Sequence, residues 1–562
     1  MKQNKIKQAL EYLPKHLGES FCQLFLLLTV AGAIIPNWDY MPQVGLDPSW
    51  IFALSQSISQ GLIFGKDVIF TFGPYAPLYT NLYHPEMNLS LFFASAGYLA
   101  IAYWICLAVI INKENWRWYF GVSAFVCFYI TLAKDVMLFS YPLIACLACH
   151  RLPQIFSGEN AGKLSSIIIL IIFSGFGFIT LIKGSILPLY FILVIFMSIF
   201  FLYKKMAYWG VLSIISFFTS IVIFWAAAGQ PLSFLMDYFS SMFLIISGYS
   251  EAMSTHGPTK HIVFYIAAYV MLMFSFCRNA NISNSDKLFI ALICLLIGFS
   301  AFKAGFVRHD AHATTAACIL IFISAGLAAV FRPKKFFIAI LLCGATWLCI
   351  DANYWNTSSM SVYSKVSHIY INQPKSFLKW SFRYPAQKKF FNAYFYATLK
   401  SIQNEVDLPL FSGTSDIYSY NQTDLLASGN LYNPRPIFQG YSAYTPKLCL
   451  ANRAHLLSPS APDNVFFRVE TIDQRLPSLD DGASWPVLLS RYRFERLLPQ
   501  NIALLRKMDK TDLTPPPCKI CATNMERLLF GRKRNRSPVR RSHFCEHQHK
   551  THPFGKGFLY VF

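Results

Sequence analysis

The chain has 562 residues, of which 54% are hydrophobic, 17% aromatic and only 14% charged, and its mean hydropathy is +0.39. Soluble globular proteins carry about 25% charged residues, so this composition excludes a chain made of several soluble domains. The formal net charge is +21. Cationic side chains between apolar runs are typical of the connecting segments of a membrane protein, and they do not indicate a nucleic-acid-binding protein.

Apolar runs that are long enough for membrane helices recur along the first 350 residues. A span requires about 20 mostly apolar residues, and somewhat shorter runs occur at the lower limit. The sequence predicts eleven spans, so we expect residues 1–350 to form a polytopic helix bundle and the fold class to be mainly α. The predicted spans are 19–36, 89–111, 119–133, 136–150, 164–182, 185–203, 208–228, 261–277, 288–302, 313–331 and 336–350.

Lysine and arginine residues in the short connecting segments predict the orientation. If the N-terminus is inside, the inner segments contain fifteen of these cations and the outer segments contain six. Cytoplasmic loops of membrane proteins carry this excess of positive charge. We therefore expect a multi-pass protein of a bacterial-type inner membrane with a cytoplasmic N-terminus. The odd number of spans places the C-terminal region outside.

Three of the predicted outer segments are long. The first, residues 37–88, separates the first two spans, and the second, residues 229–260, is an amphipathic stretch. The third, residues 351–506, is polar and has strand-like runs at 408–411, 465–469 and 487–489. Its length is sufficient for one small external α/β domain with its own core.

The last segment, residues 507–562, differs in kind from the rest of the chain. It contains 12 basic and 4 acidic residues and has no apolar periodicity, which predicts a disordered basic tail. Zinc binding is one hypothesis for its Cys and His residues, although the spacing of the second half fits no usual pair of zinc ligands. The alternative is a poorly constrained extension or a sequence read out of frame. The candidate zinc ligands are Cys518, Cys521, Cys545, His547, His549 and His552.

Carboxylates at the outer ends of the predicted bundle are candidates for catalysis, because acidic residues are costly to place beside hydrocarbon. Asp47 begins the sequence Asp-Pro-Ser-Trp in the first outer segment, and Asp67 lies further along the same segment. Asp135 lies at the outer turn between two spans. The alternatives are that Asp47 only caps a helix with Pro48 at its first position, and that Asp135 only pairs with Lys134.

A second polar group lies at the outer end of the ninth predicted span. An arginine side chain presents a planar fork that suits phosphate, and lysine adds a point charge. Lys303 and Arg308 are therefore candidate ligands of a lipid phosphate, with Lys183 at another outer turn as a third cation. One alternative is that Lys303 reaches to the membrane interface, and another is that Arg308 pairs with Asp310. A third is that the imidazoles of His309 and His312 and the carboxylate of Asp310 bind a transition metal. The group consists of Lys303, Arg308, His309, Asp310 and His312.

Asp67, His309 and Asp310 are also possible substrate-binding residues, and two further segments contain such candidates. Glu251 follows a flexible Ser-Gly pair in the second outer segment, and the alternative there is an interfacial helix. Arg435, Gln439 and Tyr441 lie in a stretch of the C-terminal domain that is rich in Pro and Tyr. Aromatic, amide and guanidinium groups suit sugar surfaces, whereas a rigid loop packed on the membrane domain explains the same residues equally well.

This arrangement resembles the GT-C superfamily of membrane glycosyltransferases, which transfer a sugar from a polyprenyl-phosphate donor to an acceptor on the outer face of the membrane. The resemblance lies in the large first outer segment with Asp47, in Asp135 in the next outer loop, in the span number and in the external C-terminal domain. The pattern Asp-x-x-Trp, Gly-x-x-x-Gly-x-Asp, Thr-x-Gly-Pro also resembles the first loop of bacterial membrane proteins placed near that superfamily. The Asp-x-Asp or Glu-x-Asp signature common in the superfamily is missing around Asp47.

The resemblance implies that Asp47 is the base that activates the acceptor. It also implies that Asp135 holds a divalent cation, Mg²⁺ or Mn²⁺, or orients the donor phosphate, although some members act without metal. The expected partners are the lipid bilayer, a polyprenyl-phosphate-linked sugar and a glycan or lipid acceptor. The alternative is a non-catalytic transporter or an assembly factor for cell-envelope polysaccharide. Polar groups at the outer mouth favour the enzyme, because transporters bind their substrates near the middle of the membrane.

Overall fold

A computed structural model describes residues 2–111, 116–129, 134–155, 159–280, 282–331, 336–354, 362–418 and 420–508. Residues up to Lys507 form one compact unit. The predicted basic tail lies outside the described residues except for its first two positions, and so do its candidate zinc ligands.

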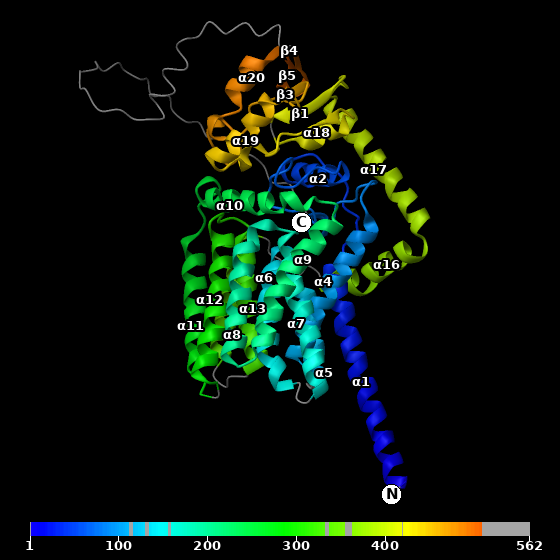
Figure 1. Ribbon diagram of the computed structural model, residues 1–562, viewed down its shortest axis with the longest axis vertical. Helices are drawn as coiled ribbons and strands as arrows, with labels where there is room; N and C mark the ends of the chain where they lie inside the picture. The colour runs from blue at the N-terminus through cyan, green and yellow to red at the C-terminus, as the bar shows by residue number, and fades with distance from the viewer. Residues whose placement is uncertain are drawn as a thin grey trace, which may run out of the picture. The chain divides into compact units, whose positions relative to one another are not determined.

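The chain is mainly helical, and ten helices in its described part are long and apolar enough to cross a membrane (Figure 1). Their outward faces expose large apolar side chains, as on α9 and α12, where Ile223 is 58% and Phe299 63% exposed. These features fit a multi-pass membrane protein. The ten helices are α4 (Leu89–Ile110), α6 (Lys134–Ile155), α7 (Glu159–Thr180), α8 (Leu187–Tyr203), α9 (Ala207–Ala227), α10 (Leu235–Ala252), α11 (Thr259–Cys277), α12 (Asn284–Phe306), α13 (Ala313–Phe331) and α14 (Phe337–Tyr354).

Nine of the eleven predicted spans coincide with these helices, and the other two differ. The first predicted span lies in α1 (Lys2–Ile34), where the apolar part, Gly18–Ile34, is shorter than the ten candidates. The third predicted span, 119–133, lies partly on α5 (Trp116–Tyr129), and its last four residues lie outside the described residues. The tenth candidate is α10, which the sequence predicts as an amphipathic stretch and not as a span.

Helix α10 runs across the ends of the bundle helices and not along them (Figure 1). Two glycines allow other segments to pack directly against it. A Cβ atom at Gly65, which has a φ of +88°, would collide with the backbone of Tyr238, and a Cβ atom at Gly184 would lie 2.5 Å from the sulfur of Met242. Only glycine combines a positive φ with this close approach. Helix α10 thus forms a layer at one end of the bundle.

The loop 37–88 packs at the same end. It contains α2 (Leu46–Ser59) and α3 (Pro77–Thr80). Its backbone pairs with the segment after α7, since Gly73 N donates to Ile182 O at 3.0 Å and Gly184 N donates to Thr71 O at 2.9 Å. It also contacts the C-terminal region, where Ile69 N donates to the carbonyl of Pro436 at 2.8 Å. The long segments predicted on one side of the membrane therefore lie together.

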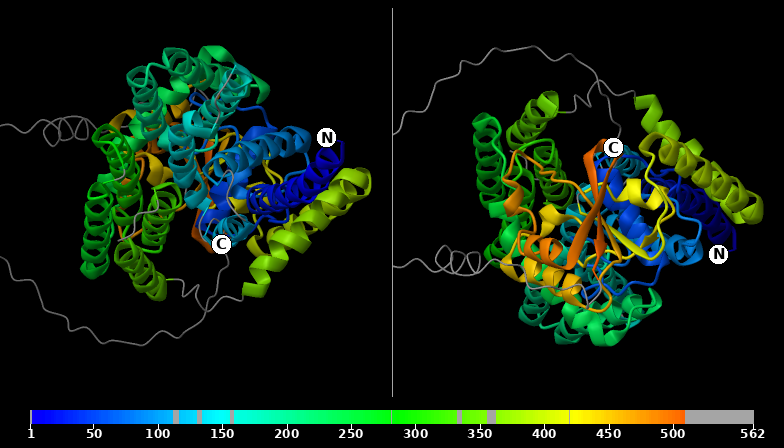
Figure 2. Two further views of the ribbon diagram at one scale, coloured as in Figure 1. Left: turned by 90° about the horizontal axis from the view of Figure 1, so that it is seen from below. Right: turned by 90° about the horizontal axis from the view of Figure 1, so that it is seen from above.

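The chain returns to the bundle after α14 before it reaches the C-terminal sheet. The returning elements are α15 (Val362–Ser367), the π-helix η4 (His368–Asn372), α16 (Gln373–Phe382) and α17 (Tyr384–Val406). Figure 2 shows α16 and α17, in yellow-green, beside the dark blue α1. The sequence assigned residues 351–506 to one external domain, whereas the structure places the first part of this range against the bundle helices.

The C-terminal region contains a five-stranded mixed sheet with the order β2-β1-β3-β5-β4. Strands β2, β1 and β3 are parallel, and β5 pairs antiparallel with both β3 and β4. Asp416 lies opposite Val465, which in turn lies opposite Leu505. The strands are β1 (Thr414–Tyr418), β2 (Leu431–Tyr432), β3 (Asn464–Phe467), β4 (Tyr492–Leu498) and β5 (Ile502–Lys507), and the helices among them are α18 (Gln422–Ala427), α19 (Pro446–Leu457) and α20 (Trp485–Arg491).

Candidate functional site

Asp47 lies in the first turn of α2 and does not cap the helix. The N-cap residue is Gly45, whose φ of +114° is accessible to glycine, so the predicted capping role of Asp47 is wrong. Its carboxylate instead accepts a hydrogen bond of 2.9 Å from the indole Nε1 of Trp50, one turn further along. A negative charge in the first turn is favourable because of the helix dipole, and Asp47 remains half-buried and accessible.

Asp135, at the start of α6, pairs with Lys183. The Nζ atom of Lys183 lies 2.7 Å from Oδ1 and 2.9 Å from Oδ2 of Asp135, and the two side chains are only 16% and 14% exposed. The predicted alternative, a pair with Lys134, is not what the structure shows, because Lys134 lies over the ring of Tyr79 at 5.6 Å. Two predicted site residues from distant segments are thus brought together.

Tyr79 of α3 connects this ion pair to the loop 37–88. The Nζ atom of Lys183 lies 5.5 Å from the centre of the Tyr79 ring, a distance at which a cation is attracted to an aromatic face. The Phe72 ring lies 4.6 Å from the Tyr79 ring and 5.4 Å from the Lys183 Nζ atom, and Trp50 stacks on Phe72 at 5.1 Å with an interplanar angle of 10°. A continuous row of aromatic rings therefore runs from Lys183 to the hydrogen-bond donor of Asp47.

The charges of both carboxylates act on Tyr79. Burial raises the pKa of Tyr79 well above its ordinary value, and the negative charges of Asp135 and Asp47 raise this pKa further. We call Asp47, Tyr79, Asp135 and Lys183 the mouth cluster. The cluster combines a half-buried carboxylate, a desolvated cation and aromatic surfaces at one end of the bundle.

Arg308 lies between two carboxylates. Its Nε atom donates to Asp310 at 2.8 Å, and its Nη1 and Nη2 atoms donate to the two oxygens of Asp473 at 2.6 and 3.1 Å. Burial alone would raise the pKa of Asp310, but its hydrogen bonds from His312 and the charge of Arg308 lower this pKa to about 2. The predicted alternative of an Arg308–Asp310 pair is observed, and Asp473 adds a contact to the C-terminal region that the sequence did not indicate.

The predicted residue Tyr441 is buried beside Met253 and Ile472. Burial raises its pKa, Tyr444 and Asp47 raise it further, and Arg308 opposes this effect. Tyr441 packs with Met253 of the segment after α10 in one small apolar cluster. The C-terminal region therefore contributes directly to the surroundings of Asp47.

Lys303 does not join this group. It is exposed near the end of α12, on the same helical face as Leu295 and Phe299, which are 51% and 63% exposed. A lysine that follows such an apolar stripe places its ammonium group at the membrane interface. The structure therefore favours the interfacial alternative for Lys303.

Asp67 and Glu251 also lie apart from the mouth cluster. Asp67 accepts a hydrogen bond from the backbone N of Ile63 at 3.1 Å and lies 3.8 Å from Lys66, so it stabilises a local turn of the loop. Glu251 is exposed in the last turn of α10. The structure gives neither carboxylate a contact with the candidate catalytic residues.

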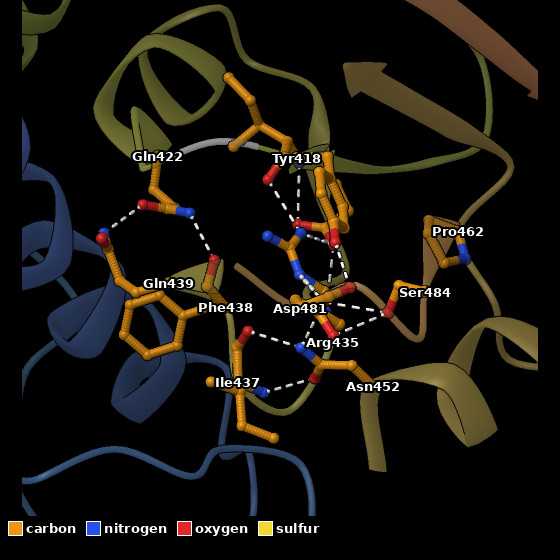
Figure 3. A network of polar contacts seen from close by, with 12 residues as sticks. Tyr418, Gln422, Arg435, Ile437, Phe438, Gln439, Asn452, Pro462, Asp481 and Ser484 are labelled. Atoms are coloured by element: carbon orange, nitrogen blue, oxygen red, sulfur yellow. Dashed lines mark hydrogen bonds and ion pairs between the residues drawn. The ribbon is translucent and has the colours of Figure 1, made fainter. Parts of the chain in front are cut away.

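Arg435 and Gln439 are buried and make structural contacts (Figure 3). The Nη1 atom of Arg435 donates to Asp416 at 2.8 Å and to the carbonyl of Ile417 at 3.0 Å, and Asp481 lies 3.5 Å from its Nε atom. Gln439 donates to the carbonyl of Tyr420 at 3.2 Å. These side chains cannot reach a sugar at the surface, so the rigid-loop alternative holds for both.

The metal-binding hypotheses fit the described residues poorly. No group of three His, Cys, Asp or Glu side chains suited to a metal ion occurs within the described ranges. Both oxygens of Asp135 are bound by Lys183, and His309 is buried with its ring 5.6 Å from the ring of His261. Burial lowers the pKa of His309. We therefore assign no Mg²⁺, Mn²⁺ or transition-metal ion to these residues.

Sequence reasoning missed the aromatic row and Asp473. The spacing of Asp47 and Trp50 places both on one face of a helix, so their contact could have been found from the sequence. Asp473 has no such local signal, because its partner comes from the bundle.

Comparison with known proteins gives no matching family model and no significant match to a curated protein or a solved structure.

Proposed function

We propose that the chain is a membrane glycosyltransferase similar to the GT-C enzymes, which transfers a sugar from a polyprenyl-phosphate donor to an envelope acceptor. The observation that supports this proposal most strongly is the row of aromatic rings, Tyr79, Phe72 and Trp50, that connects the Asp135–Lys183 pair to the hydrogen-bond donor of Asp47. A base, a cation for phosphate and aromatic surfaces for a sugar are the groups that this transfer requires.

Each group has a role in the proposed transfer. Asp47 takes the proton of the acceptor hydroxyl as the new bond forms between the acceptor oxygen and the sugar C1 atom. The bond between C1 and the phosphate oxygen breaks, and the polyprenyl phosphate leaves with the electron pair. Lys183 lies next to this developing negative charge, and Asp135 holds the Lys183 ammonium group in place. The partly exposed ring of Trp50, which stacks on the buried Phe72, offers an apolar face to the sugar.

The proposal includes a location and partners. The protein would reside in a bacterial-type inner membrane with its N-terminus in the cytoplasm and the mouth cluster on the outer face. Its partners would be the bilayer, the lipid-linked sugar and a glycan or lipid acceptor. Ten apolar helices and the excess of basic residues in one set of short segments support this location.

Reconstitution tests the proposal. The wild type, Asp47→Asn and Glu86→Gln are reconstituted in liposomes with labelled polyprenyl-phosphate sugars. Glu86 is an exposed carboxylate of the same loop and serves as the matched control. Loss of a general base slows transfer by about 10²- to 10⁴-fold, so we expect this loss in Asp47→Asn and wild-type turnover in Glu86→Gln.

Two outcomes contradict the proposal. Equal turnover of the wild type and Asp47→Asn removes the proposed base. Absence of turnover with every donor favours the second candidate, a non-catalytic transporter or an assembly factor for envelope polysaccharide.

A further inference from the structure

Helix α16 has one packed face and one open face. Trp380 on the packed face is 3% exposed, and its ring lies 5.2 Å from Phe391 and 6.2 Å from Tyr83. The open face borders a groove of about 560 Å³. Cationic and apolar side chains alternate along this face, and the groove is lined by Tyr370, Lys375, Leu378, Lys379, Phe382 and Arg383 among others.

The contacts of η4 place this groove at the end of an apolar helix. Tyr370 stacks on Phe25 of α1 at 5.2 Å, and its hydroxyl lies 2.7 Å from the hydroxyl of Thr29. Gln373, the first residue of α16, donates to the carbonyl of Ile35 at 2.9 Å. The apolar part of α1 ends at Ile34, so in a membrane that α1 crosses, α16 begins at the depth where hydrocarbon gives way to headgroups.

The open face has positive charge without a local counter-charge. The sequence has no acidic residue between Asp351 and Glu405, and Lys375, Lys379 and Arg383 are all exposed. In the described part of the chain, no ion pair involves any of these three cations. Lys375 and Lys379 are four residues apart on one face of α16, and Arg383, the C-cap residue, lines the same groove beside Leu378 and Phe382, which are 52% and 81% exposed.

We propose that this groove binds the headgroup of an anionic glycerophospholipid. The three cations contact the phosphate-containing headgroup, and Leu378 and Phe382 contact the upper part of the acyl chains. An amphipathic helix with basic and large apolar side chains is suited to the membrane interface. The anionic headgroup supplies the counter-charge that the chain itself lacks. The site lies on η4 and α16, and it does not depend on the proposed transferase activity.

Lipid titration of the delipidated full-length protein in neutral detergent tests the proposal. Native mass spectrometry measures the affinity for phosphatidylglycerol and phosphatidylcholine. The variant K375Q/K379Q/R383Q removes the three cations. A basic side chain near an anionic surface changes affinity by about fivefold, so we expect the triple variant to bind phosphatidylglycerol about 100-fold more weakly. We expect phosphatidylcholine to bind the wild type and the triple variant equally.

The control is K447Q/R453Q/R491Q, which removes three exposed cations of α19 and α20 and should keep wild-type affinity. If the triple variant does not fold, the single variant K379Q and the salt dependence of the wild type replace it, with an expected fivefold loss and weaker binding at high salt. Equal affinity of the wild type for both lipids would overturn the proposal. An unchanged affinity of the triple variant for phosphatidylglycerol would also overturn it. So would a triple variant that loses binding of polyprenyl phosphate but keeps binding of phosphatidylglycerol.

Discussion

Substitution of Lys183 by Met should destabilise the protein through the carboxylate that it leaves behind. Both oxygens of Asp135 lie within 2.9 Å of the Lys183 ammonium group, and the side chains are only 14% and 16% exposed. Breaking a fully buried ion pair by removing one partner costs about 3–5 kcal/mol. The remaining exposure allows some hydration, so we expect Lys183→Met to lower the free energy of unfolding by about 3 kcal/mol.

The double variant separates this effect from lost packing. Asp135→Asn alone leaves the lysine without its counter-charge, with an expected cost of about 2 kcal/mol. In Asp135→Asn with Lys183→Met no charge is left unpaired, so the costs of the single variants do not add. We expect a coupling energy of about 2 kcal/mol, within the range for residues in direct contact.

Equilibrium unfolding of the full-length protein in mixed micelles measures these free energies. The matched control is the cycle on Lys66 and Asp67, which lie 3.8 Å apart and are 54% and 35% exposed. Exposed pairs contribute about 0–1 kcal/mol, so its coupling should be small. If the costs of Lys183→Met and Asp135→Asn add within about 0.5 kcal/mol, the charge pair does not stabilise this end of the bundle and our reasoning is refuted.

Three further predictions concern the surrounding structure. Burial raises the pKa of Asp424 to about 6, above its ordinary 3.8. The neutral carboxyl therefore adds to the free energy of unfolding fully below pH 3.8, and this contribution is lost as the pH rises through 6. Asp424→Asn should remove this pH dependence of thermal unfolding, which amounts to about 3 kcal/mol, and an unchanged profile would contradict the assignment. Gly65→Ala should lower the unfolding temperature more than Gly61→Ala, because both have positive φ but only Gly65 packs against Tyr238; equal effects would exclude the proposed contact. Arg308→Lys removes the two-pronged bond to Asp473, and hydrogen exchange around residue 473 should become about fivefold faster, whereas unaltered exchange would show that the bond does not hold this segment.

The sequence predicts well those elements whose pattern is local. Long apolar runs locate most of the candidate spans, since length and hydropathy define them. The strand predicted at 465–469 corresponds to β3, whereas the run 487–489 lies in α20 and the run 408–411 precedes β1 without forming a strand. Short apolar runs fit a buried helix turn and a strand equally well, and only tertiary contacts decide between them.

The candidate site was predictable in its residues but not in its contacts. Asp47, Asp135 and Lys183 were identified from charge beside apolar sequence. Their arrangement depends on the pairing of Thr71 and Gly73 with the segment after α7, which no local spacing encodes. The same limit applies to Arg435, which lies in a Pro- and Tyr-rich stretch. It is wholly buried and pairs with Asp416 and Asp481, which are distant in the sequence.

The position of α10 has a consequence for the order in which the protein is made. This helix packs on Gly65 and Gly184, which leave the ribosome before it, and Tyr444, which leaves after it, lies against Gly248 near its end. Arg308 likewise can pair with Asp473 only after this later residue has been synthesised. The contacts of Gly248 and Arg308 each join an early segment to a late one, so the bundle helices can insert one by one, but these two residues acquire their partners only after the C-terminal region has been made. A nascent chain halted after α14 would contain every proposed catalytic residue and the Asp135–Lys183 pair, but it would lack Tyr441 beside Met253 and Asp473 on Arg308.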